Sequence, residues 1–309
     1  MKEPGLNVLL AGEEAAGLQT LRALARTEHR IAAVLASSAD ATVGKVARQM
    51  GYEIWPADLV KDPGFAARVR DRAIDIILNV HSLHIVHPEV LRAARLGGFN
   101  LHPGPLPAYA GLNTISWAIY RGETSYGVTL HEMSPVVDAG RIAYAASFPI
   151  GEDDTPMSLM RKCVEEGVPL VMRLLETAAR HPDAIPRIEQ DLALRRIFGR
   201  KIPEGGRLDW ARPAARIVNF VRACDYHPLP SPWGHPRTRW GDRDIGIARA
   251  SRTGRRADGP PGKVGEPSGP DIDVACEDEW ILVRLLVVDG ERRRPAVVLR
   301  PGDRLGEVS

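Results

Sequence analysis

The first half of the chain alternates short apolar runs with amphipathic stretches, and this alternation constrains the fold more than any other feature. The apolar runs, which we interpret as buried strands, are Leu6–Ala11, Ile31–Ala36, Ile74–Asn79 and Phe99–Leu101. The stretches with helical periodicity between them are Leu18–Arg26, Val43–Met50 and Phe65–Arg72. Strands separated by helical segments of about 10–15 residues form a parallel sheet covered by helices on both faces. The sequence therefore predicts an α/β domain with a doubly wound, mostly parallel sheet.

The pattern changes after Gly122. We interpret Val128–Met133 and Ile142–Phe148 as strands that close one edge of the sheet, and residues 157–179 as an outer helix. A segment rich in Pro, Gly and charged residues follows, and we place a domain boundary there, between residues 203 and 204.

Beyond that boundary the sequence predicts one helix, Ala214–Ala223, followed by short strands separated by Gly and Pro turns. The strands are expected at Asp244–Ala248, Ile272–Cys276, Trp280–Val288 and Ala296–Leu299. We interpret Ser251–Pro270, which is rich in Gly, Pro and Arg, as a mobile loop. Short strands of this kind indicate a small β-barrel-like domain over residues 204–309.

Charge is nearly balanced, because 41 Lys and Arg residues accompany 39 Asp and Glu residues, for a formal net charge of +2. A chain this close to neutral has no bulk attraction for nucleic acid or anionic lipid. Its three cysteines are far apart and odd in number, which indicates neither a disulfide framework nor a zinc ribbon. No apolar run approaches the roughly 18 residues of a membrane-spanning helix, and the amino-terminal residues do not resemble a signal peptide. We expect a cytoplasmic protein with no membrane partner.

Two motifs in the first half are weak indications of ligand sites. The turn Gly12–Gly17 lies where a phosphate loop would lie, but it lacks both the dinucleotide and the Walker patterns and contains two glutamates. We interpret it as a tight turn into a helix. His81, His84 and His87 recur at every third residue, which matches neither a helix face nor the period of a strand. We place these histidines in a loop and expect no metal site.

The densest group of polar and conformationally special residues is Phe99–Gly111, with the sequence FNLHPGPLPAYAG. Asn100 and His102 are two residues apart at the end of a strand, so both side chains project from one face of the sheet. They emerge at its carboxyl edge, where open α/β sheets bind ligands. An amide donor for a developing oxyanion and an imidazole for proton transfer are the groups that acyl-transfer chemistry needs. The sequence therefore predicts a catalytic pair here.

A carboxylate that orients the imidazole would complete such a site. Downstream, a strand that contains His131 leads into a turn that contains Asp138. We therefore take Asp138 as the third catalytic candidate. The sequence has no G-x-S-x-G motif and no cysteine near these histidines, so no covalent nucleophile is indicated.

Residues 99–142 resemble the 10-formyltetrahydrofolate-dependent formyltransferases, the family of methionyl-tRNA formyltransferase and the sugar N-formyltransferases. The segment reads FNLHPGPLPAYAGLNTISWAIYRGETSYGVTLHEMSPVVDAGRI. It follows, in order, the family's Asn-x-His, Leu-Pro-x-Tyr-x-Gly, Trp-Ala, Gly-Val-Thr-x-His and Asp-x-Gly elements. The similarity continues through residues 198–210, 218–223, 261–264 and 274–282. It implies a Rossmann-like catalytic domain over residues 1–203 and an OB-like carboxyl-terminal domain over residues 204–309.

The resemblance implies transfer of a formyl group from 10-formyltetrahydrofolate, as co-substrate, to an amine, with no metal. His102 would transfer the proton, Asn100 would stabilise the tetrahedral oxyanion and Asp138 would organise His102. The family's pterin pocket is bordered by the loop after the fourth strand and by main chain ahead of the aspartate. In this chain the corresponding positions are His84, Val86, Leu106 and Val137.

Departures from the family pattern narrow the acceptor. Methionyl-tRNA formyltransferases have a basic insertion after the second strand, whereas residues 36–45 of this chain are nearly uncharged. With few charges to neutralise phosphates, tRNA is disfavoured. We expect a small-molecule amine, namely an amino sugar nucleotide or an amino-acid-derived biosynthetic intermediate. The alternatives are tRNA formylation, hydrolysis of the formyl donor and folate binding without turnover; the oligomeric state, a homodimer included, is open.

Overall fold

The computed structural model describes residues 5–306, which divide into two compact units. The first contains the chain up to Gly111 together with Tyr126–Phe148 and Arg161–Ile197. The second contains Leu112–Ser125, Pro149–Met160 and the chain from Phe198 onward. The units are not continuous in sequence, and a boundary between residues 203 and 204 stays a prediction.

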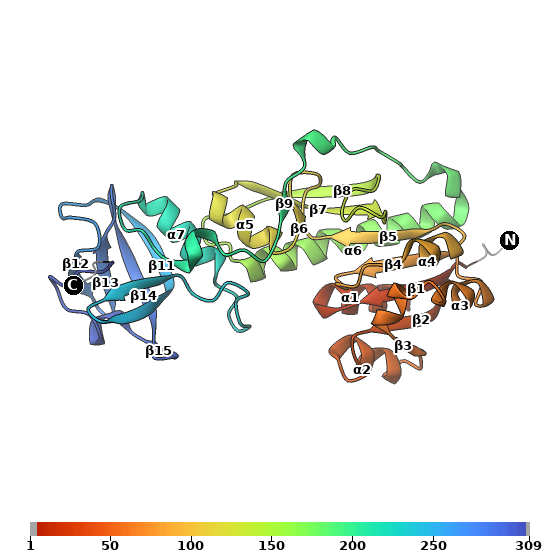
Figure 1. Cartoon of the computed structure of the whole chain (residues 1–309), viewed down its shortest axis with the longest axis horizontal. Helices are drawn as coiled ribbons and strands as arrows, with labels where there is room; N and C mark the ends of the chain where they lie inside the picture. Colours follow the sequence, from red (N-terminus) through yellow and green to blue (C-terminus); the bar gives the residue numbers. More distant parts are fainter. Residues whose placement is uncertain (1–4, 307–309) are drawn as a thin grey trace. The chain divides into compact units, whose positions relative to one another are not determined.

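The first unit is built on a seven-stranded sheet with strand order β3-β2-β1-β4-β5-β7-β8 (Figure 1). Its strands are β1 (Asn7–Gly12), β2 (Arg30–Ala36), β3 (Ile54–Pro56), β4 (Ile76–Val80), β5 (Gly98–His102), β7 (Ser125–Glu132) and β8 (Ile142–Pro149). The first five of these strands pair in parallel and β7 runs antiparallel to β5. β1 and β4 are almost entirely buried, as strands covered on both faces must be.

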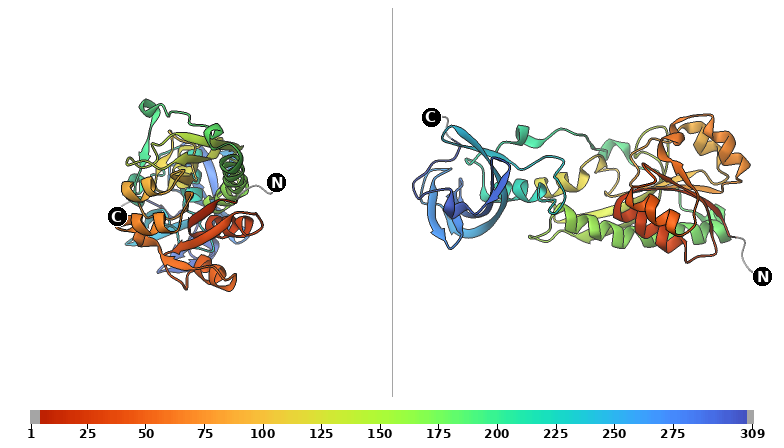
Figure 2. Two further views of the ribbon diagram at one scale, coloured as in Figure 1. Left: turned by 90° about the vertical axis from the view of Figure 1, so that its right-hand side faces the viewer. Right: turned by 90° about the horizontal axis from the view of Figure 1, so that it is seen from below.

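Helices cover both sides of this sheet (Figure 2). The helices between its parallel strands are α1 (Glu14–Leu24), α2 (Thr42–Gln49), α3 (Phe65–Asp71) and α4 (Pro88–Ala93), and the long α6 is Pro156–Arg180. The chain proceeds outward from β1 to β3 and then returns to β4 on the other side of β1. Since crossovers are right-handed, this reversal moves the connecting helices to the opposite face and makes the boundary between β1 and β4 the switch point, where sheets of this type bind ligands. The predicted doubly wound, mostly parallel sheet is confirmed.

The second unit contains a six-stranded antiparallel sheet. Its strands are β10 (Arg237–Trp240), β11 (Arg243–Arg256), β12 (Val264–Ser268), β13 (Asp271–Ala275), β14 (Glu279–Val288) and β15 (Glu291–Arg293). The helices of this unit are α5 (Thr114–Arg121) and α7 (Ala214–Ala223), and the two-residue strands of the chain are β6 (Ala110–Gly111) and β9 (Ile197–Phe198). Isolated bridges join Trp240 to Leu305 and Lys263 to Arg304, so the last residues of the unit connect the ends of its sheet. The predicted separate β domain is confirmed.

Two predictions in this unit are wrong. Ser251–Pro270 is not one loop, because β11 extends to Arg256 and β12 begins at Val264. The extension is held by Glu279, whose carboxylate accepts from Arg252 at 2.7 Å and from the backbone N–H of Thr253 at 2.8 Å. The sequence does not predict this part of the strand, because polar contacts hold it and its residues show no apolar periodicity. Residues 296–299 are not a strand either, because Pro295–Val297 form a 3-10 turn that begins with proline.

No helix within residues 5–306 combines the length and the apolar character needed to cross a membrane. The three cysteines are free thiols buried in the structure.

Candidate active site

Asn100 and His102 lie on the same side of β5, as their spacing predicts. In the antiparallel ladder with β7, Asn100 is paired with His131 and His102 with Thr129. β5 pairs on its other edge with β4, which borders the switch point of the sheet. The two side chains therefore lie at the carboxyl edge of the strand, beside the place where sheets of this type bind ligands.

The Asp138 carboxylate meets both histidines of this ladder. Its Oδ2 atom lies 3.6 Å from Nδ1 of His102, and its Oδ1 atom lies 3.5 Å from Nε2 of His131. The backbone N–H of Gly111 donates to Oδ2 at 2.8 Å. The side chains of His102, His131 and Asp138 are almost completely buried. The structure thus brings together the predicted catalytic residues His102 and Asp138, and it links the third, Asn100, to this group through His131.

The imidazole of His102 has an acceptor on each side. Nε2 lies 2.6 Å from the carbonyl oxygen of Tyr109, and since a carbonyl only accepts, this nitrogen carries a hydrogen. The gap of 3.6 Å between Nδ1 and Asp138 is longer than a hydrogen bond. Burial lowers the pKa of His102, while the charge of Asp138 and the Tyr109 carbonyl act against that shift. The ring is therefore neutral at physiological pH, and Nδ1 faces a carboxylate that would stabilise an added proton.

The Asp138 carboxyl stays ionised. Burial by itself raises its pKa, but the neighbouring imidazoles of His131 and His102 and the backbone N–H of Gly111 together outweigh burial and lower the pKa to about 2. The site consequently holds one permanent negative charge beside an imidazole that can accept a proton.

His131 orients the amide of Asn100. Nδ1 of His131 lies 2.8 Å from the carbonyl oxygen of Glu132, so Nδ1 carries the hydrogen of the neutral ring. Nε2 is then an acceptor, and it lies 3.1 Å from Nδ2 of Asn100. Using one amide hydrogen this way fixes the direction of the second, which is the donor that a developing oxyanion needs.

The loop after β5 is held at its start by side chains of β7. The hydroxyl of Thr129 donates to the carbonyl of Gly104 at 2.8 Å and accepts from the N–H of Leu106 at 3.1 Å. The Tyr126 hydroxyl donates to the carbonyl of Pro103 at 2.8 Å. A Cβ atom at Gly104 would lie 2.7 Å from Nε2 of His102 and from the carbonyl oxygen of Tyr109. Only glycine allows the loop to pass this close to the imidazole.

We predict that Gly104→Ala lowers the free energy of unfolding by about 1–3 kcal/mol, because the added methyl group forces His102 and Tyr109 apart in a tightly packed site. Urea denaturation measures this loss. Gly199→Ala is the matched control, since a Cβ there meets nothing within 4 Å, and its midpoint should stay near that of the wild type. A wild-type midpoint for Gly104→Ala would contradict the assigned contact.

The predicted pterin-pocket residues lie on three separate segments of the first unit. His84 and Val86 belong to the loop between β4 and α4, Leu106 to the loop after β5 and Val137 to the turn that carries Asp138. The Val86 side chain is buried in the hydrophobic core. Val137 is half exposed. Their role in binding stays a prediction.

The turn at Gly12–Gly17 leads directly into α1, as predicted. Both of its glutamate side chains contact other residues of the protein. Glu13 accepts from the N–H of Ser37 at 2.5 Å, and Glu14 lies 3.4 Å from Nδ1 of His81. His81 and Glu14 both have left-handed backbone, with φ values of 62° and 55°. The edge formed by β1 and β4 therefore presents carboxylates where a phosphate loop would present N–H groups.

Of the three spaced histidines, His81 and His87 have unrelated environments. His81 contacts Glu14, whereas Nδ1 of His87 accepts from the N–H of Glu89 at 3.2 Å and caps α4. Within residues 5–306, no group of three or more His, Cys, Asp or Glu side chains has an arrangement that could hold a metal ion.

Two residues of the site are absent from the sequence prediction. His131 precedes the predicted Asp138 on the same segment, and its position in the Gly-Val-Thr-x-His element was a usable signal. Gln190 lies far along the chain, where its Nε2 donates to the carbonyl oxygens of Asp138 at 3.0 Å and Gly140 at 2.6 Å. No spacing relates Gln190 to the other residues, so sequence alone offered no signal for it.

Comparison with protein families gives two matches. Residues 8–175 match the family described as formyl transferase. Residues 201–299 match the family described as formyl transferase, C-terminal domain.

Solved structures share this architecture at low sequence identity. HypX from Aquifex aeolicus in complex with tetrahydrofolic acid is 19% identical with a TM-score of 0.66, over 95% of this chain and 47% of HypX. This chain thus spans about half the length of that protein. The N-formyltransferase from Helicobacter canadensis, in complex with folinic acid and dTDP-3-aminofucose, is 18% identical with a TM-score of 0.68, over 90% of this chain and 98% of its own.

Glycinamide ribonucleotide transformylase 1 from Symbiobacterium toebii is 24% identical with a TM-score of 0.51, over 60% of this chain and 95% of its own. At these identities the comparisons establish a shared fold.

Proposed function

Because the chain belongs to the formyl transferase family, we propose that it transfers the formyl group of 10-formyltetrahydrofolate to a primary amine of a small-molecule acceptor. The acceptor class is an amino sugar nucleotide or an amino-acid-derived biosynthetic intermediate. The observation that carries the proposal is the convergence of Asn100, His102 and Asp138, linked by contacts of 3.1 to 3.6 Å through His131.

His102 acts as the base. An amine must lose a proton as its nitrogen bonds to the formyl carbon, and a general base works best near its own pKa. Nδ1 of neutral His102 takes that proton, and the resulting imidazolium is stabilised by Asp138 on one side and the carbonyl of Tyr109 on the other. When the bond between the formyl carbon and N10 breaks, the same proton is available to N10, so the products are an N-formyl amine and tetrahydrofolate.

Asn100 stabilises the oxyanion that forms on the formyl oxygen. Its Nδ2 donates one hydrogen to His131, and the second is available to the developing charge. Because the amide is already oriented, it does not reorganise when the charge appears. The remaining rate acceleration comes from holding the amine and the formyl donor together. Effective molarities of this kind lower the activation barrier by roughly 7–11 kcal/mol.

The pterin would be bound by the segments that contain His84, Val86, Leu106 and Val137. The folate ligands of the Aquifex aeolicus and Helicobacter canadensis structures support a folate as the donor for this fold. No metal is required by the roles assigned to the side chains.

Two features support a small acceptor over tRNA. The segment after β2, residues 37–41, contains no basic residue. Arginines on the second unit's sheet are paired with acids, with contacts from Arg249 to Asp225 at 3.2 Å and from Arg252 to Glu279 at 2.7 Å. Because these arginines are neutralised by neighbouring carboxylates, they attract phosphates less strongly. The sugar nucleotide in the Helicobacter canadensis structure supports the same class of acceptor.

We expect tetrahydrofolate to form from 10-formyltetrahydrofolate only when a suitable amine is present. The test is a panel of nucleotide-linked amino sugars and amino-acid-derived amines, with initiator tRNA as a further acceptor and an arm that contains no acceptor. Turnover with a small amine supports the proposal. Rapid turnover without an acceptor would show that the protein hydrolyses the formyl donor. Formylation of tRNA that weakens steeply with added salt would show that tRNA is the acceptor. Folate binding without any turnover would contradict a catalytic role.

A further inference from the structure

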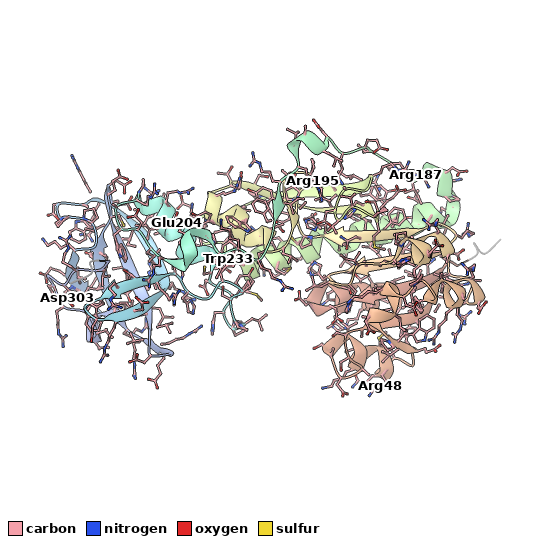
Figure 3. All side chains as sticks on the ribbon, viewed as in Figure 1. Arg48, Arg187, Arg195, Glu204, Trp233 and Asp303 are labelled. Atoms are coloured by element: carbon pink, nitrogen blue, oxygen red, sulfur yellow. The ribbon has the colours of Figure 1, made fainter. Side chains whose placement is uncertain are left out.

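A segment far from the catalytic residues in sequence forms hydrogen bonds with the loop after β5 and with the turn that contains Asp138. We call residues 187–196, which follow α6 and its terminal turn, the strap. Arg187 and Arg195, labelled in Figure 3, lie near its two ends. At its end, the N–H of Arg196 donates to the carbonyl of Pro107 at 3.3 Å, and the carbonyl of Arg196 accepts from the N–H of Ala110 at 3.0 Å. The strap thereby contacts the loop after β5.

The strap also holds the turn that carries Asp138. The N–H and carbonyl of Ile188 pair with Ile142 at 3.0 and 2.8 Å, and a guanidinium N–H of Arg195 donates to the carbonyl of Val137. Between these contacts, Nε2 of Gln190 donates to the carbonyls of Asp138 and Gly140. Both partners are carbonyl oxygens, which only accept, so the nitrogen of the amide must face them. Side chains of the strap thus bond three carbonyls of this one turn.

The backbone of Asp138 needs such support. Its φ of 53° is in the left-handed region, which a residue with a side chain seldom occupies without help from its surroundings. Two residues later, a Cβ at Gly140 would lie 1.9 Å from the carbonyl oxygen of Glu132, so the turn is pressed against β7. A change of φ at Asp138 would swing the carboxylate away from His102 and His131.

We propose that Gln190 is a positioning residue for the formyl transfer reaction. By bonding the carbonyls on both sides of the turn, its amide holds the left-handed backbone that directs the Asp138 carboxylate to His102. Its Oε1 atom is buried and has no hydrogen-bond partner within the described part of the chain, so the donor side of the amide is the side that the structure uses. The role deepens the proposed function and rests on it.

Three variants test this role. Gln190→Met removes the donor at similar length. Gln190→Glu keeps the shape but places an oxygen opposite two carbonyls. Because the latter adds a negative charge, the double variant Glu189→Gln/Gln190→Glu restores the net charge of the strap, and Glu189→Gln alone is the control, since Glu189 is exposed.

We expect kcat for formyl transfer to fall by about 10- to 100-fold in the three variants at Gln190, with unchanged KM for the amine and the folate, because a displaced group costs rate and not ground-state binding. Glu189→Gln should retain wild-type kcat. A purely structural role would instead lower the melting temperature and leave kcat of the folded fraction unchanged, and that result would overturn the proposal.

A second readout is independent of activity. The charged and titratable groups that face His102 are Asp138, His131 and His81, and among them Asp138 raises its pKa. If the turn relaxes in Gln190→Met, the pKa of His102 moves further down, which NMR titration of the imidazole nitrogens detects. An unchanged His102 titration in both single variants at Gln190 would overturn the positioning role. If the wild type transfers no formyl group to any amine, the proposed function fails, while this titration still decides whether Gln190 controls the Asp138 contact.

Discussion

Replacement of His102 by alanine is expected to reduce formyl transfer by about 10²- to 10⁴-fold, the range that general acid–base catalysis contributes. The alanine side chain leaves no atom at the position of Nδ1, so the proton of the attacking amine has no acceptor beside Asp138. The measurement is kcat/KM for tetrahydrofolate release with the acceptor identified in the amine panel.

His29→Ala is the matched control for this prediction. His29 precedes β2, at the amino edge of the same sheet, where its Nδ1 accepts from the N–H of Leu6 at 3.2 Å. It should transfer formyl groups at the wild-type rate once its folding is verified. Full activity of both His102→Ala and Asp138→Asn would rule out the proposed mechanism.

Asp138→Asn adds a pH signature to the same experiment. The charge of Asp138 raises the pKa of His102 against the larger effect of burial, so its removal lowers that pKa further. Because the base acts in its neutral form, the acidic limb of the kcat profile should move to lower pH in this variant. The remaining rate should be smaller, since a weaker base accepts the proton less readily.

Replacement of Asn100 by alanine is expected to reduce kcat by about 10²- to 10³-fold, as does loss of a single oxyanion donor in acyl-transfer enzymes. The effect belongs to the transition state, because charge on the formyl oxygen develops only there. Binding of a folate analogue, measured by calorimetry, should therefore remain close to that of the wild type.

Asn7→Ala serves as the control for Asn100. Asn7 begins β1, and its side chain donates to the carbonyl of Ala73 at 3.1 Å, away from the carboxyl edge of the sheet. Transfer should be unaffected in this variant. If Asn100→Ala lost folate binding and kcat together, the amide would be a binding group and not an oxyanion donor.

Most strands of the first unit are predictable, because short runs or alternations of apolar residues coincide with β1, β2, β4, β5, β7 and β8. The prediction for Ile31–Ala36 differs from the observed β2 by one residue. β3 was missed because its three residues, with a proline last, are too short to show a period. The polar end of β11 is not predictable from local sequence, because Glu279, on another strand, supplies the contacts that hold it.

The candidate site was partly readable in the same way. Asn100 and His102 were found because a strand of period two places both on one face, which is a local property of the backbone. Asp138 is predictable as a carboxylate that follows a strand and could orient the imidazole, and the family resemblance implies the same contact with His102. Its left-handed backbone is not visible in a residue name, because that conformation depends on the strap and on β7.

The sequence by itself determined the α/β class, the edge of the sheet that would be polar and the residue types available for proton transfer and oxyanion binding, since these follow from periodicity along one segment. Only the tertiary structure decided that His131 accepts from Asn100, that Asp138 contacts both histidines and that Gln190 bonds the turn between them. Those contacts join segments far apart in the chain. Burial of apolar side chains brings such segments together, and the residues that then meet depend on the whole fold.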